Sequence, residues 1–246
     1  MNRNRHAARM LVLGIVGVAS LALIAEVASA RSRHASHAAS VRIGSGVQLV
    51  PDKGRFRILA NGKEAGLEDF EITPSKGGWV VRGNSTIQTA KGPAHVNGTL
   101  ELKADGSPVR YDWATDGDKK AAAVVTFNGA AAEIALNVAN TNPYKQQLSF
   151  STMPVVLDNN LYDQYAVLAG LYDWSKKGVQ TFSVLVPQSL APGTITVESL
   201  GKQDADGRQM DELRVKSDDL ELDLFLDKGR LMRIDVPGSN AEIVRD

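Results

Sequence analysis

Short runs in which apolar and polar side chains alternate recur along the chain from Val41 onward. In one run, Val96, Leu100 and Leu102 alternate with Asn97 and Glu101. A period of two places successive side chains on opposite faces of a strand, which predicts a sheet with one buried face and one wet face. Other runs put on the expected core face Phe182, Val184 and Val186, then Leu220, Leu222, Leu224 and Leu226, and then Met232, Ile234 and Val236.

Dipeptides that tolerate a positive φ separate these runs about every ten residues, the spacing of an antiparallel meander. They are Asn61-Gly62, Asp105-Gly106, Asp116-Gly117, Asn128-Gly129 and Asp206-Gly207. We therefore predict a mainly β fold of about a dozen strands. A sheet of that width must curve strongly or form an open barrel, because the twist between neighbouring strands accumulates.

One long segment, about Asn159–Lys177, breaks the rhythm of alternation. Four large side chains recur in it at steps of four, three and four: Leu161, Tyr165, Leu168 and Tyr172. Asp163 and Asp173 fall on the opposite side of a helical wheel, so the segment predicts one central amphipathic helix. We expect this helix to lie in the concave face of the sheet, since it is the only long helix available to cover that apolar face.

The first thirty residues have the features of a secretory signal peptide. A basic start precedes the apolar run Leu11–Ala25, and the small residues Ala28 and Ala30 match a cleavage site. The apolar run is shorter than the about 20 residues that a membrane span needs. We therefore expect cleavage after Ala30, a periplasmic or extracellular location, and no stable membrane anchor after processing.

The remaining chain divides into a short lead and one domain. Residues 31–40 are small, basic and polar, which predicts a disordered lead. Residues 41–246 are expected to form a single β-rich domain. The alternative is two packed units divided near Asn140–Pro143, where the sequence resembles a linker.

Composition excludes several kinds of chemistry. The chain has no cysteine, which removes disulfides, thiol nucleophiles and cysteine-bound metals. Within the expected domain the one histidine is His95, and neither nucleotide-binding motifs nor a nucleophile elbow are present. We expect no cofactor and no metal site. The charge is balanced, with 28 basic and 28 acidic residues, which gives no indication of a nucleic-acid partner.

Aromatic side chains are the remaining candidates for a site. Rings around an apolar cleft can hold a lipid, a glycan or a peptide. The alternative is that these rings are ordinary core and rim residues between the helix and the sheet. The candidate ligand-binding residues are Tyr165, Leu168 and Tyr172 on the expected helix, Tyr111 and Trp113 on one strand, and Trp79 at the start of another.

Three stretches carry a resemblance to known proteins: GRFRILANGKEAGLEDFEI at 54–72, LKADGSPVRYDW at 102–113 and LELDLFLDKGRLMRIDVP at 220–237. With the mid-chain helix, they resemble uncharacterised bacterial exported proteins classed as domains of unknown function. The implied architecture is similar to that of periplasmic lipoprotein-carrier proteins, in which an open β-barrel with a helix holds acyl chains. The resemblance implies a fold and assigns no catalytic residue.

Three functional hypotheses follow. The first is a non-catalytic periplasmic or secreted binding protein for an apolar, lipid-like small molecule. The second is an envelope scaffold that binds another envelope protein through a strand edge or the wet face of the sheet. The third is a hydrolase that uses carboxylates on the expected wet faces of the strands.

Overall fold

The structure is a computed structural model that describes residues 47–117, 120–176, 178–218 and 220–246. The expected signal peptide, with Ala28 and Ala30, and the expected lead at 31–40 lie outside the described residues. Within the described ranges, no helix is long and apolar enough to cross a membrane.

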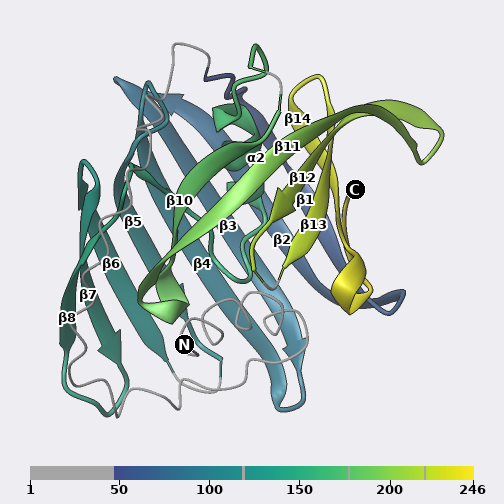
Figure 1. Ribbon diagram of the computed structural model, residues 1–246. Helices are drawn as coiled ribbons and strands as arrows, with labels where there is room; N and C mark the ends of the chain where they lie inside the picture. The colour runs from purple at the N-terminus through teal and green to yellow at the C-terminus, as the bar shows by residue number, and fades with distance from the viewer. Residues whose placement is uncertain (1–46, 118–119, 177, 219) are drawn as a thin grey trace.

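The described chain forms one sheet of 15 strands (Figure 1). This confirms the predicted curved, mainly antiparallel sheet, with more strands than the expected dozen. The strands are β1 (Asp52–Ala60), β2 (Lys63–Ser75), β3 (Gly78–Thr89), β4 (Gly92–Lys103), β5 (Pro108–Thr115), β6 (Ala121–Asn128), β7 (Ala131–Val138), β8 (Tyr144–Ser149), β9 (Pro154–Val156), β10 (Gln180–Val186), β11 (Ala191–Ala205), β12 (Arg208–Lys216), β13 (Glu221–Asp227), β14 (Arg230–Val236) and β15 (Ala241–Arg245). Every neighbouring pair is antiparallel except β9 and β10, which are parallel.

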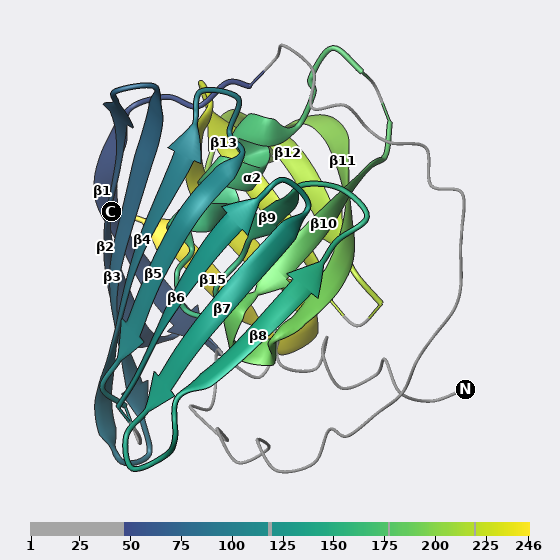
Figure 2. The same ribbon diagram turned by 90° about the vertical axis from the view of Figure 1, so that its left-hand side faces the viewer.

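The meander begins and ends in the middle of the sheet. Strand β1 pairs with β15, so the chain runs from the centre to the edge strand β8, reappears at the other edge as β9, and returns to the centre. Five Cα–Cα steps join Ser149 to Pro154, and they span at most about 18 Å. The two edges of the sheet must therefore come close, which forces it to roll up. Strand β9 lies against β5, and β11 lies against β8. Figure 2 shows the two ends of the sheet overlapping.

Local sequence patterns account for most strand ends and faces. Asn61 and Gly62 have φ values of 51° and 72°, so the hairpin between β1 and β2 uses the positive-φ pair that the sequence predicted. On β4 the expected alternation of buried and exposed residues is confirmed. On β14 the prediction for Met232 is wrong. An irregularity in the pairing with β13 turns Leu231 into the core, where it is 0% exposed, and leaves Met232 half-buried.

The helix α2 (Asp163–Leu171) lies inside the rolled sheet, as predicted, but it is shorter than expected and is not amphipathic. All nine of its residues are buried, including Asp163, which is 1% exposed. The prediction of a wet side at Asp163 is wrong because the sheet wraps around the helix and leaves no solvent-facing side. Two short 3-10 helices, η1 (Pro187–Ser189) and η2 (Pro237–Ser239), complete the described elements.

Candidate functional site

Two facing glycines allow the chain before α2 to press against the sheet. Gly83 on β3 pairs with Gly98 on β4. A Cβ atom on Gly83 would lie 2.8 Å from Leu161 Cδ2, and one on Gly98 would collide with Leu161 Cδ1 and lie 2.9 Å from the Tyr111 hydroxyl. Only glycine leaves room at these positions, so they fix where α2 begins.

A buried carboxylate holds the N-terminus of α2. Glu68 on β2 is 0% exposed, and its two carboxyl oxygens accept hydrogen bonds from the backbone N–H of Tyr162 at 2.7 Å and of Asp163 at 3.0 Å. The first N–H groups of a helix have no partner within the helix and carry a partial positive charge. Glu68 therefore caps α2 from a neighbouring strand.

A second buried acid fastens the preceding loop. Asp158 is 1% exposed and accepts hydrogen bonds from the Tyr111 hydroxyl and from Gln188 Nε2, each at 2.6 Å. The backbone N–H of Asp158 donates to Gln164 Oε1 at 2.6 Å. These bonds connect the loop to β5, to η1 and to the first turn of α2.

Burial, and then the charge of the third acid, Asp163, hold the pKa of the Glu68 carboxyl well above its usual range. In the described part of the chain, none of the acids Glu68, Asp158 and Asp163 forms an ion pair with a lysine or arginine. Burial raises the pKa of all three, to about 6 for Asp158 and well above the usual range for Glu68. The expectation that the acids lie on wet faces is wrong for these three.

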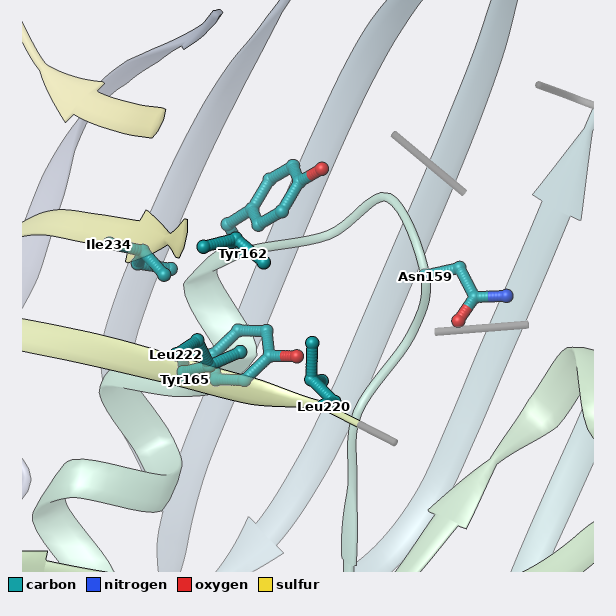
Figure 3. A pocket seen from close by; sticks show the side chains of 7 residues that line it. Asn159, Tyr162, Tyr165, Leu220, Leu222 and Ile234 are labelled. Atoms are coloured by element: carbon teal, nitrogen blue, oxygen red, sulfur yellow. The ribbon is translucent and has the colours of Figure 1, made fainter. Parts of the chain in front are cut away.

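A small cavity of about 20 Å³ lies beside the N-terminal half of α2 (Figure 3). The hydroxyl of Tyr162 is buried and has no hydrogen-bond partner among the described residues. Figure 3 shows the rings of Tyr162 and Tyr165 extending toward the side on which Asn159 lies. The cavity is lined by Asn159, Tyr162, Tyr165, Leu220, Leu222, Ile234 and Val236.

A second cavity of about 100 Å³ lies at the C-terminal end of α2. Its lining includes one carboxylate, from Asp211, and one large aromatic ring, from Trp174. The lining residues are Gln48, Ala169, Gly170, Trp174, Asp211, Leu226 and Gly229. Both cavities therefore lie where α2 faces β13, β14 and their connections, an interface that we call the seam. The seam extends from Leu222 to Leu226, roughly 13 Å at the rise of a β-strand.

The candidate ligand residues predicted from the sequence do not come together at one site. Tyr165, which is 5% exposed, is the one that lines either cavity. Leu168 is fully buried, Tyr111 bonds Asp158, and Tyr172 donates its hydroxyl to the Gly178 carbonyl at 3.0 Å. Trp113 is buried in the core. Trp79 is half-buried and packs against the core.

Sequence reasoning missed the acids because their burial depends on distant partners. For Glu68 a signal was present, since it alternates with Phe70 and Ile72 and therefore points inward on β2. No comparable signal marks Asp158 or Asp163. Among the described residues, no group of three or more histidine, cysteine, aspartate or glutamate side chains is arranged to hold a metal ion.

Comparison with known proteins supports the fold. No protein-family model matches the chain, and no curated protein matches it. The chain is similar to the crystal structure of a β-barrel-like protein of the domain of unknown function DUF1849 from Brucella abortus, with a TM-score of 0.54 and 10% sequence identity. The match covers 81% of this chain and 96% of that chain. The expected resemblance to barrel-like proteins of unknown function is therefore confirmed at the level of the fold.

Proposed function

We propose that the protein is an exported, non-catalytic binding protein that holds an apolar, lipid-like chain in the seam between α2 and strands β13 and β14. The observation that carries the proposal is the asymmetric packing of α2. Both cavities lie in the seam, one toward each end of the helix. On its other side, α2 is capped by Glu68, and the chain before it is pressed onto Gly83 and Gly98.

Binding in the seam requires α2 to move. The two cavities, of about 20 and 100 Å³, are much smaller than the several hundred Å³ of a typical ligand site. Because the polar contacts hold the N-terminal end of α2 on the side of β2 to β5, its C-terminal end and strands β13 and β14 can separate while those contacts persist. The surface that it would uncover is apolar, with Leu222, Leu224 and Ile234 at its centre.

A displacement assay with an uncharged fluorescent alkyl probe tests this binding. Val236→Phe fills the small cavity and should weaken binding at least about tenfold, with Val236→Ile giving an intermediate loss. Val244→Phe is the matched control, since Val244 is half-buried on the neighbouring strand β15 and lines neither cavity. Thermal melts identify variants that fail to fold. If Val236→Phe and Val244→Phe bind the probe equally well, the ligand does not bind in the seam.

The proposed location rests on the expected signal peptide. N-terminal sequencing of the protein from its own host should find Arg31 as the first residue, and native mass spectrometry of the same sample should show a bound molecule. A protein that retains Met1 would contradict export. A clean unliganded mass together with no binding of the uncharged alkyl probe would contradict an apolar ligand.

The edge strand β8 favours a second function, as an envelope scaffold. Among the described residues β8 pairs with β7 alone, and Tyr144 at its start is 38% exposed. An unpaired edge can accept a strand of another protein. Crosslinking in the host, with a photoreactive residue replacing Gln147, should capture a single partner if this function holds. Val236→Phe should leave that crosslink unchanged.

A further inference from the structure

The two ends of the seam differ in chemistry. At the Leu222 end the strands contribute only aliphatic side chains to the cavity wall, which suits the end of an apolar chain. At the Leu226 end the larger cavity adds the carboxylate of Asp211, the indole of Trp174 and the exposed polar residue Gln48. An amphiphilic ligand would therefore have its polar head at the Leu226 end.

The helix supplies negative potential at that end. The larger cavity is lined by Ala169 and Gly170, in the last turn of α2, and this turn contains no basic residue. The carboxyl end of a helix carries a partial negative charge. The Gly170 carbonyl accepts a hydrogen bond from the Gln48 N–H at 2.9 Å, which reduces this charge without adding a positive group. A cation at the cavity would be stabilised, and an anion would be repelled.

The charged side chains beside the cavity include two ion pairs. Asp211 is paired with Lys202 on the adjacent strand at 3.3 Å, with the two side chains 37% and 63% exposed. Exposed pairs of this kind contribute little and exchange readily. The next charged pair beyond Trp174 is Asp173 with Lys176 at 3.1 Å, which is neutral overall. A ligand cation can therefore compete with Lys202 for Asp211.

Trp174 adds a contact that an ammonium group prefers. Its indole packs edge-on against the ring of Tyr172, with centroids 5.2 Å apart, which holds it in place beside the cavity. Indole faces attract ammonium cations, most strongly those with methyl groups. An aromatic ring, a carboxylate and a helix C-terminus around a cavity of about 100 Å³ form a site for such a head.

We infer that the ligand has a positively charged ammonium head, which binds between Trp174 and Asp211, and a chain that runs along the seam toward Tyr165. This inference rests on the proposed function and specifies the ligand class and its orientation.

Three probes share a 12-carbon chain and differ in the charge of the head group, so they distinguish the affinity due to the head from that due to the chain. They are dodecyltrimethylammonium, dodecanol and dodecanoate, each below its micellar concentration. In the wild-type protein, the ammonium probe should bind at least about tenfold more tightly than dodecanoate, with dodecanol between them. Asp211→Asn and Trp174→Leu should each reduce this preference to about threefold or less. Lys202→Ala should increase it, because it frees the Asp211 carboxylate.

Asp204→Asn is the matched control for Asp211→Asn. It removes an acid from the paired strand of the same hairpin, outside the cavity lining, and should leave the preference unchanged. Equal affinity for all three probes, or an unchanged preference in Asp211→Asn, would overturn the cationic head while leaving the apolar site intact. Failure of all three probes to bind would instead contradict the proposed function.

Discussion

Replacing Asp158 with asparagine should change how the stability of the protein depends on pH. The substitution keeps the shape of the side chain and removes its charge. Tyr111 can still donate to the remaining carbonyl oxygen. The Gln188 amide can rotate so that Oε1, which has no partner among the described residues, accepts from the new amide. The two side-chain bonds are therefore replaced, and the long bond from the Asn160 N–H to Oδ1, at 3.4 Å, is the one that is lost. The main effect of the variant is the removal of charge.

Burial raises the pKa of Asp158 from 3.8 to about 6. A carboxyl with a raised folded-state pKa favours folding fully below its unfolded pKa, and this contribution is lost as pH rises through the folded pKa. A shift of about 2 units corresponds to about 3 kcal/mol, at about 1.4 kcal/mol per unit. The wild-type protein should therefore lose about 2–3 kcal/mol relative to Asp158→Asn as pH rises from about 4 to 8, since a small part of the contribution is already lost at pH 4.

Urea denaturation at pH 4, 5, 6, 7 and 8 measures the difference in unfolding free energy between the two proteins at each pH. The difference should favour Asp158→Asn increasingly with pH and level off above about pH 7. Asp69→Asn is a control of opposite sign. Asp69 is exposed, and its bond to Arg55 lowers its pKa, so this variant should become slightly less stable than wild type as pH rises. If the difference in unfolding free energy between wild type and Asp158→Asn is the same at every pH, burial does not raise the pKa of Asp158 in the folded protein.

Three other perturbations probe the packing around α2 and the closure of the sheet. Gly98→Ala should destabilise the fold by about 1–3 kcal/mol in urea melts, because its methyl group would overlap Leu161. Gly238→Ala is the control and should be neutral, since no atom lies within 4 Å of the new carbon. Leu168→Ala should cost about 2–5 kcal/mol by the same measurement, as buried leucine truncations do, and a cost below 1 kcal/mol would show that α2 is not packed as described. Arg245→Ala removes two 2.7 Å bonds from the buried Asp52 carboxylate and should cost about 1–3 kcal/mol, because Arg230 remains 3.8 Å from the same carboxylate. A cost below about 1 kcal/mol would mean that this contact does not join β1 to β15.

The strands were predictable because their signals are local. Alternation on β4 and the positive-φ pair Asn61-Gly62 each depend on a few neighbouring residues, and the structure has both. The inner face of β14 was predicted wrongly, since the irregular pairing with β13 shifts the alternation by one residue at Leu231. Such an irregularity is a property of two strands together, and the pattern of either strand alone does not contain it.

The helix and its acids show where local reasoning fails. A helical wheel assumes that one side of the helix is wet, but the sheet surrounds α2, so the side with Asp163 is as buried as the side with Leu168. Burial of Asp163 depends on Glu68, which lies 95 residues earlier in the chain. The inward position of Glu68 on β2 was visible in the alternation with Phe70, and an inward acid indicates that a polar partner must come from elsewhere in the fold.

The contacts of α2 also set the direction in which the proposed opening can occur. The N-terminal end is held by Glu68 and by the network of Asp158, both of them buried carboxylates. The C-terminal end is held by neutral bonds. The Tyr172 hydroxyl donates to Gly178 at 3.0 Å and accepts from the Ser199 N–H at 3.2 Å, the Gly170 carbonyl accepts from the Gln48 N–H at 2.9 Å, and Gln180 bonds the Asp173 backbone. Each of these neutral bonds is broken at lower cost than a bond to the buried carboxylate cap. Opening should therefore pivot about the first turn of α2 and displace its last turn most, which would widen the larger cavity, beside Trp174, before the smaller one.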